Sequence, residues 1–170
     1  MNGKSVSVLG VAGDDHLGGS DFDQRMQSLL EAKLADAALS TDASQAEERC
    51  DSIGLYILAE AVKIRLSSEQ RVETKCRGED GQDRILVMTR EEFEAGARDL
   101  FDRAMAPVEK VLADQMMTSL HVDDIVLVGG ASRTPKIRSL LRDFFGDAKK
   151  LHTDIDPDIT VAWGAASILD

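Results

Sequence analysis

Hydrophobic residues in the first two thirds of the chain recur with both strand-like and helical spacing. A short apolar run at 6–11 predicts a strand. After it, hydrophobic residues three and four positions apart predict one helix that opens near Ser20 and a second at about 47–66. The runs 70–75 and 84–89, separated by a turn rich in glycine and charged residues, predict a β-hairpin. This part of the chain is therefore expected to be rich in helix, with one hairpin.

The ends of the helices carry sequence signals of their own. Ser20 is the expected N-cap of the first helix, and Asp23 can complete a capping box with it. Thr89 and Glu92 form a second capping box, which opens a long helix. Pro107 is expected to kink or restart that helix, because proline removes one backbone hydrogen bond and clashes with the preceding turn. The side chains predicted to face inward on the three helices are Phe22, Met26, Leu29, Leu30, Leu34, Leu55, Leu58, Ala59, Val62, Leu66, Phe93, Ala97, Leu100, Ala104 and Val108.

The final third of the chain alternates strand and helix. A continuous, buried apolar strand is predicted at 124–128, and it runs into Gly129 and Gly130 at the start of a helix. A short strand near 150–151 and a helix opened by Pro157 complete the pattern. The whole chain is accordingly predicted to have a mixed α/β fold. The predicted inward side chains of the last two helices are Ile137, Leu140, Leu141, Phe144, Val161, Ala162, Ala165 and Ile168.

Composition and charge narrow the classes of partner. Of the 170 residues, 43% are hydrophobic and 30% are charged, as in a soluble globular protein of one domain or two small subdomains. The net charge of -11 argues against nucleic acid and against an anionic membrane as the main partner, since both select a basic face. Two interpretations of the acidity stay open: a well-solvated surface, or an acidic face for a basic protein partner.

The two cysteines, Cys50 and Cys76, are too few for a disulfide framework. Both are expected to be buried or half-buried thiols in a reducing compartment. The three histidines stand far apart, so none belongs to a cluster with metal-ligand spacing. The sequence has no apolar run of about 18 residues and no signal-peptide pattern. The expected location is the cytoplasm, with an organelle matrix as the alternative.

Two glycine pairs carry the first hint of ligand chemistry. Gly129 and Gly130 follow a strand where a helix begins, and Gly18 and Gly19 precede another helix. Glycine lets the backbone approach a ligand closely, and the free N–H groups at a helix start attract anions. A plain tight turn stays open as the alternative. Neither pair matches the Walker A pattern or the dinucleotide-binding fingerprint.

Four ordered segments then identify a family resemblance. The segments 13–25, 60–68, 124–137 and 156–166 resemble the nucleotide-binding domain of the 70-kilodalton heat-shock chaperones (DnaK-type). The resemblance extends over nearly the whole chain, from about Ser5 onward. It implies an actin-like fold, in which two lobes clasp ATP with magnesium.

The resemblance covers the second lobe of that domain only. It implies an upper subdomain at 18–97 and a base subdomain at 1–17 and 98–170, whose sheet is expected to be incomplete. We expect the chain to be a piece of a longer protein. Because it starts abruptly within the family pattern, Met1 is expected to have been added when the segment was excised.

The resemblance also assigns candidate adenine-nucleotide contacts. Lys63 and its helix neighbours would face ribose and adenine, a role that suits positions on one helical face. Arg133 would stack on the adenine from the other side. Glu60 and Lys63 could instead form a solvated ion pair. The implied nucleotide-binding residues are Gly18, Gly19, Glu60, Lys63, Ser67, Gly129, Gly130, Arg133 and Asp158.

Three positions depart from the family pattern. Ser20 stands where the family usually has Glu, and Ala131 replaces a usual Ser. Ile64 occupies the position of an Arg that would sandwich the base opposite Arg133. That change removes a cation-stacking contact of about 1 kcal/mol, unless Arg65 takes its place.

The family's phosphate loops, catalytic lysine and catalytic carboxylates all lie upstream of the matching segments. Phosphoryl transfer depends on groups placed around the phosphates, so this chain alone is expected not to hydrolyse ATP. Magnesium is expected only in the complete domain. Because the peptide-binding domain is also absent from the match, the chain alone is not expected to act on unfolded clients.

Two functions from different classes remain. The first is an adenine-nucleotide-binding lobe of a chaperone ATPase, whose partners are the first lobe and co-chaperones. The second is a protein-interaction module gripped by nucleotide exchange factors, with weak or lost nucleotide binding. An unpaired sheet edge would in addition favour a dimer.

Overall fold

The computed structural model describes residues 7–41, 46–147, 149–152, 156 and 159–167. Within it the chain divides into two compact units. We call Gly18–Leu100 the central unit, and residues 1–17 together with 101–170 the split unit. Both contain helix and sheet, so the predicted mixed α/β fold is confirmed.

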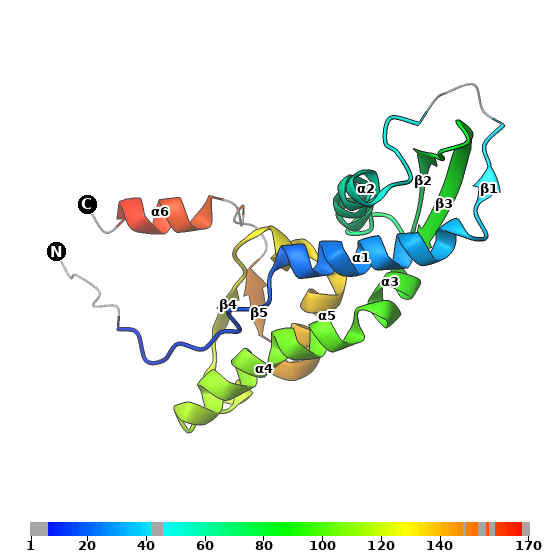
Figure 1. Ribbon diagram of the computed structural model, residues 1–170. Helices are drawn as coiled ribbons and strands as arrows, with labels where there is room; N and C mark the ends of the chain where they lie inside the picture. The colour runs from blue at the N-terminus through cyan, green and yellow to red at the C-terminus, as the bar shows by residue number, and fades with distance from the viewer. Residues whose placement is uncertain (1–6, 42–45, 148, 153–155, 157–158, 168–170) are drawn as a thin grey trace. The chain divides into compact units, whose positions relative to one another are not determined.

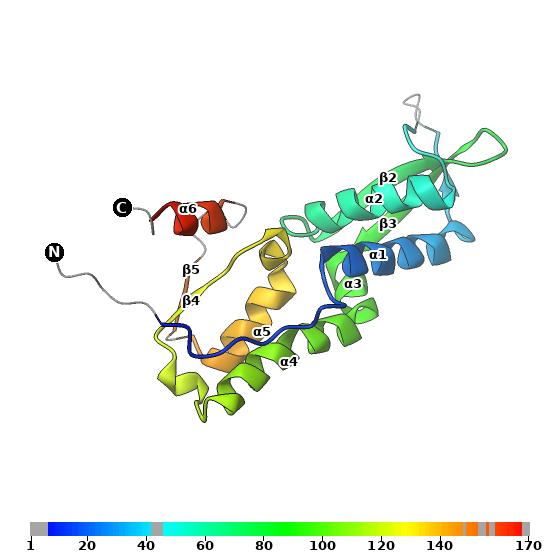
Figure 2. The same ribbon diagram turned by 60° about the vertical axis from the view of Figure 1, so that its left-hand side comes forward.

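The central unit is a three-stranded antiparallel sheet with helices α1 and α2 on one face (Figures 1 and 2). Strand β3 lies in the middle, with β1 on one side and β2 on the other. The predicted hairpin is therefore confirmed as β2 and β3. The elements of this unit are α1 (Gly19–Leu34), β1 (Ala38–Leu39), α2 (Ser52–Arg65), β2 (Arg71–Arg77), β3 (Asp83–Thr89) and α3 (Arg90–Gly96).

The core of the central unit lies between the helices and the sheet. Strand residues on one face alternate with exposed ones, so Val72 of β2 is paired with Met88 of β3 and both are buried. The helices contribute the faces predicted from the spacing of their hydrophobic residues. The buried hydrophobic side chains of this unit are Phe22, Met26, Leu30, Leu55, Ala59, Val62, Leu66, Val72, Cys76, Leu86, Met88, Phe93, Ala97 and Leu100.

The predicted start of α1 is wrong by two residues. Gly18, and not Ser20, is the N-cap, because its N–H donates to the Asp21 carboxylate at 2.6 Å. Asp23 is buried and takes no part in the cap. Strand β1 follows α1 after a short turn.

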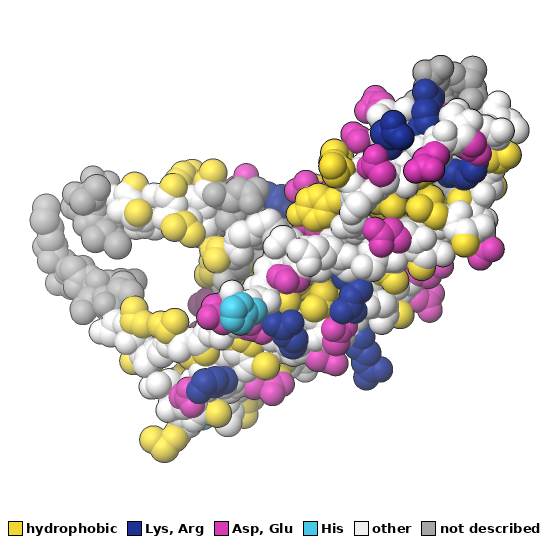
Figure 3. Space-filling model, viewed as in Figure 1, with side chains coloured by type: hydrophobic (Ala, Val, Ile, Leu, Met, Phe, Trp, Pro, Cys, Tyr) yellow, Lys and Arg dark blue, Asp and Glu magenta, His cyan; other side chains and the backbone are white. Residues whose placement is uncertain are grey.

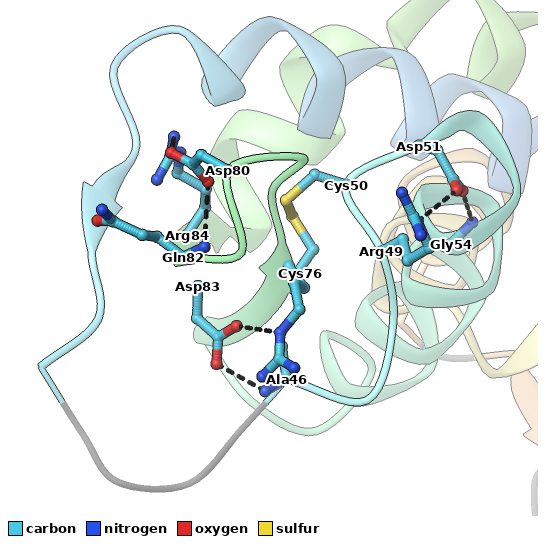
Figure 4. The surroundings of a disulfide bond; sticks show 11 residues. Ala46, Arg49, Cys50, Asp51, Gly54, Cys76, Asp80, Gln82, Asp83 and Arg84 are labelled. Carbon is cyan, nitrogen blue, oxygen red and sulfur yellow. Dashed lines mark hydrogen bonds and ion pairs between the residues drawn. A yellow bond between two sulfur atoms is a disulfide. The ribbon is translucent and has the colours of Figure 1, made fainter.

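The predicted start of α2 is also wrong, by five residues. A disulfide joins Cys50 to Cys76 of β2, with their Cα atoms 4.9 Å apart (Figure 4). Arg49 pairs with Arg77 in an isolated parallel bridge beside it. Extended backbone at this point cannot be helix, so α2 begins only at Ser52. The prediction of two reduced thiols is corrected, since sequence spacing gave no sign that these two positions meet.

The loop that carries Cys50 also packs tightly on the first turn of α2. A Cβ atom on Gly54 would lie 2.1 Å from the Arg49 carbonyl oxygen, so only glycine fits here. Asp51 caps the helix by accepting a hydrogen bond from the Gly54 N–H at 2.9 Å. The crossing of loop and helix is thus fixed by a cap, a glycine and a disulfide.

The capping box of Thr89 and Glu92 is confirmed at the start of α3. The long helix predicted after it is instead two helices, α3 and α4 (Arg98–Asp114), which are separated at Ala97. α4 continues through Pro107, so of the two predicted effects, a kink or a restart, the restart does not occur.

The split unit contains the second, parallel sheet. Strand β4 pairs with β5 in parallel. The predicted short strand near 150–151 is confirmed as β5. The remaining elements are α4, η1 (Ser119–His121), β4 (Asp124–Val126), η2 (Gly130–Arg133), α5 (Pro135–Phe145), β5 (Lys150–His152) and α6 (Thr160–Ser167).

Several buried positions predicted for the split unit are exposed. Residues 7–11 form no strand, and Val8 and Val11 are exposed. Strand β4 is shorter than predicted, and Val126 is 50% exposed, because a two-stranded sheet covers neither of its faces. α6 is exposed along its described side chains, including Val161, so its inward face is also wrong (Figure 3). Ile168 and Pro157 lie outside the described residues.

The described core of the split unit is small. Phe101 and Met105 of α4 are buried, each one position after a residue predicted to face inward, Leu100 and Ala104. On α5, Leu141 is buried as predicted. In the described residues of both units, no helix is long and apolar enough to cross a membrane.

Candidate functional site

The first glycine pair lies at the start of α1. Gly18 has an extended backbone and its N–H is taken by Asp21. Gly19 begins the helix, and its carbonyl oxygen accepts a hydrogen bond from the Lys63 ammonium at 3.3 Å. Gly19 and Lys63 stand 44 positions apart in the chain. The fold therefore brings two of the candidate residues together inside the central unit.

Lys63 is held more firmly by a carboxylate. Its Nζ lies 2.6 Å from Asp23 Oδ1 on α1, and the two side chains are only 17% and 9% exposed. The ion pair of Lys63 is thus made across the two helices, and not with Glu60 as the alternative interpretation held. Sequence reasoning missed Asp23 as a partner. The available signal was a charged residue placed on the apolar stripe of α1, between Phe22 and Met26.

The rest of the α2 face is more open. Glu60 is exposed, and Ser67 is half-buried in the turn directly after the helix. Ile64 is 60% exposed. The predicted face of α2 is therefore present, but the stacking position carries an aliphatic side chain.

Arg65 is engaged away from that position. Its guanidinium makes two hydrogen bonds to the Glu69 carboxylate, at 2.9 and 3.0 Å, and one to the Glu73 carbonyl. The hydrogen bond to Arg65 lowers the pKa of Glu69, and the same bond raises the pKa of Arg65. In the structure Arg65 does not replace the missing cation at Ile64.

The second glycine pair lies in the split unit. Gly129 has φ 80° and ψ 152°, a backbone that strongly favours glycine. A 3₁₀ turn, η2, follows at Gly130, so the predicted helix starts only at Pro135. Ser132 stabilises the turn, because its hydroxyl donates to the Gly129 carbonyl at 2.7 Å.

Arg133 ends this turn. Its guanidinium lies 2.9 Å from Asp156 Oδ1, and both side chains are about half exposed. This pair places Arg133 at the surface, where its planar group can meet a ligand. Asp158, the remaining candidate, lies outside the described residues.

A groove that sequence reasoning did not predict runs between α1 and α2. It has a volume of about 550 Å³ and one apolar end, formed by Ile53 and Tyr56. Figure 3 shows hydrophobic side chains at the surface around α2. Among the described residues, no group of three or more His, Cys, Asp or Glu side chains could hold a metal ion. The residues lining the groove are Gln24, Gln27, Ser28, Glu31, Ser52, Ile53 and Tyr56.

Comparison with known proteins decides the family. A sequence model described as Hsp70 protein matches residues 1–169. The chain belongs to the Hsp70 family. It is similar to heat shock 70 kDa protein BIP3 of Oryza sativa subsp. japonica, with 38% identity over 170 residues, covering 98% of this chain and 24% of the relative.

Two further relatives agree with this Hsp70 assignment. Heat shock cognate 70 kDa protein 3 of Dictyostelium discoideum is 36% identical over 167 residues, covering 94% of this chain and 25% of the relative. A ribosome-associated molecular chaperone of Saccharomyces cerevisiae is 38% identical over 165 residues, covering 96% of this chain and 26% of the relative. The chain spans about a quarter of the length of these Hsp70 relatives.

Proposed function

We propose that this chain is the adenosine-binding lobe of an Hsp70-type chaperone ATPase domain. It binds ATP or ADP through its glycine pairs, α2 and Arg133, and it hydrolyses neither nucleotide alone. The central unit serves as the upper subdomain of the lobe and the split unit as its base. Its partners are the first lobe, co-chaperones and nucleotide exchange factors.

One observation carries this proposal more than any other. Lys63 and Gly19 are brought within hydrogen-bond distance although they are far apart in the chain. A lysine beside the glycine turn that opens a helix combines an ammonium donor with closely approachable backbone, which suits a polar ligand such as a nucleotide. Arg133 adds a planar cation suited to stacking on a base.

Isothermal titration of ADP into the purified chain tests the proposal. We expect saturable binding that Arg133→Ala weakens roughly tenfold, since a stacking cation contributes about 1–2 kcal/mol. Arg142→Ala is the matched control, because Arg142 is an exposed arginine near the end of α5. Absence of binding at millimolar ADP, with the fold verified by circular dichroism, would refute nucleotide binding by the chain alone.

A second function is favoured by the surface of α2. Ile53, Tyr56 and Ile57 are exposed in the same region as Ile64. Aromatic and aliphatic side chains at the rim of a groove are typical anchors for a protein partner. The second candidate is therefore an interaction module that binds nucleotide exchange factors and has weak nucleotide affinity.

Binding of a purified Hsp70 nucleotide exchange factor separates the two functions. If the interaction module is correct, Tyr56→Ser reduces factor binding severalfold while Arg133→Ala leaves it unchanged. If the nucleotide-binding lobe is correct, Arg133→Ala weakens ADP binding and Tyr56→Ser leaves ADP binding unchanged. Surface plasmon resonance with both variants measures both outcomes.

A further inference from the structure

We propose that Asp23 is a positioning residue of the nucleotide site: it holds the Lys63 ammonium against the turn of Gly18 and Gly19. This inference rests on the proposed nucleotide-binding function and assigns a role to a residue outside the predicted contacts. The contact responsible is the 2.6 Å ion pair between Asp23 on α1 and Lys63 on α2.

The burial of Asp23 makes it an unusual carboxylate for this acidic chain. Only 6% of the residue is exposed, whereas most of its carboxylates are solvated. A carboxylate removed from water needs an opposite charge, and the Lys63 ammonium supplies it. The ammonium is therefore restrained on one side by the helix that begins at the glycine turn.

The contacts of Lys63 connect α2 with the glycine turn at the start of α1. Lys63 also donates a hydrogen bond to the Gly19 carbonyl oxygen at 3.3 Å. Its contact with Asp23 is an ion pair and not a hydrogen bond, since Asp23 Oδ1 has no hydrogen-bond partner in the described residues. An ammonium has three donors, so donors remain for a ligand after the hydrogen bond to Gly19. Since α1 carries both Asp23 and Gly19, the two contacts together restrain the ammonium relative to the glycine backbone. A preorganised donor contributes more to binding than a freely rotating one.

Asp23 could have the opposite effect if it merely neutralised Lys63. The carboxylate would then compete with an anionic ligand, and its removal would strengthen ADP binding. The two roles predict opposite changes in ADP affinity when the charge of Asp23 is removed. Asp23→Asn keeps the shape of the side chain and removes its charge, so it is the informative variant.

A double-mutant cycle measured by ADP titration tests the positioning role. We expect Asp23→Asn and Lys63→Met each to weaken ADP binding roughly tenfold, as for one charge-assisted hydrogen bond. The double variant should bind ADP no more weakly than either single variant, because both remove the same contact. Glu31→Gln is the control, since Glu31 is an exposed carboxylate on the same helix. Unchanged or tighter ADP binding by Asp23→Asn, or losses that multiply in the double variant, would overturn the proposal.

Two further measurements keep the test decisive. If Asp23→Asn does not fold, Asp23→Glu retains the charge but displaces the carboxylate by one methylene. Weakened ADP binding by that folded variant supports positioning, and wild-type affinity overturns it. If the unmodified chain binds no ADP, the proposed function fails. NMR chemical shifts of the Gly18 and Gly19 amides then test the ion pair between Asp23 and Lys63 without any ligand. Matching shifts in Asp23→Asn and Lys63→Met support it, and shifts in only one variant refute it.

Discussion

The two units of this chain differ in how they bury hydrophobic side chains. Of the seventeen buried hydrophobic residues described, fourteen belong to the central unit and three to the split unit. An antiparallel sheet with helices on one face can bury that face by itself. A parallel pair such as β4 and β5 normally needs cover on both faces, and here Val126 and Val128 are half exposed.

The difference extends to the candidate site. Lys63 stands on α2, which packs one face into the core, and is held by a largely buried ion pair. Arg133 stands at the end of a short 3₁₀ turn and is paired at the surface. Exposed ion pairs contribute little free energy, so the pair with Asp156 restrains Arg133 less firmly than the buried pair with Asp23 restrains Lys63. Two glycine pairs that look alike in the sequence are therefore accompanied by cations held with very different firmness, Lys63 in one unit and Arg133 in the other.

Removal of a core side chain should show the largest difference between the units. Leu30→Ala is expected to lower the free energy of unfolding by about 3 kcal/mol, because Leu30 is fully buried. Val126→Ala should cost only about 0.5 kcal/mol, because half of Val126 is exposed. Urea unfolding followed by circular dichroism measures both. Equal losses would contradict the unequal burial.

Loss of the disulfide should destabilise the central unit almost as much. The bond closes a loop between positions 26 residues apart, which corresponds to about 3 kcal/mol in the chain-entropy account. Replacing Cys50 and Cys76 by Ala, or adding dithiothreitol to the unmodified chain, is expected to have this effect on urea unfolding. The double variant should not respond to dithiothreitol. A response to the reductant in that variant would show that another process is involved.

Restoring a stacking cation at position 64 should increase the ADP affinity of the central-unit contacts. Ile64→Arg is expected to tighten ADP binding about fivefold, since an exposed cation–π contact contributes about 1 kcal/mol. The control Ile53→Arg adds the same charge to α2 eleven positions earlier. Isothermal titration that gave equal gains for both variants would attribute the effect to general charge.

The smallest expected effect is a pH dependence near the disulfide. Hydrogen bonds from the Arg77 guanidinium and the Ala46 N–H lower the pKa of Asp83 below its usual 3.8 (Figure 4). The stabilising contribution of Asp83 is thus present above pH 3.8 and is lost as the pH falls through the lower folded-state pKa. Asp83→Asn should flatten the acid limb of the stability curve, measured by thermal unfolding between about pH 2 and 6. Asp36→Asn, at an exposed aspartate, is the control.

The sequence predicted those features that depend on neighbours close along the chain. The inward faces of α1 and α2, the hairpin and the cap of Thr89 were correct, because a one-sided core imposes a clear period. The start of α2 could not be predicted, since it depends on a disulfide between distant positions. The same holds for Asp23, which local reasoning placed in a helix cap and the structure pairs with Lys63.

The predicted inward face of α6 was wrong for a different reason. Val161 and its neighbours have the composition of a buried helix, but the described residues of the split unit offer no surface that covers them. Period and composition report a tendency to be buried, and only the surrounding structure determines whether that tendency is satisfied.

The order of the two units along the chain bears on how the protein folds during synthesis. The central unit is one uninterrupted stretch, Gly18–Leu100, whereas the split unit is assembled from both sides of it. On a translating ribosome the whole central unit is synthesised before β4 and β5, and domains generally fold as units in that order. The lysine side of the candidate site would therefore be complete while the arginine side is still being translated.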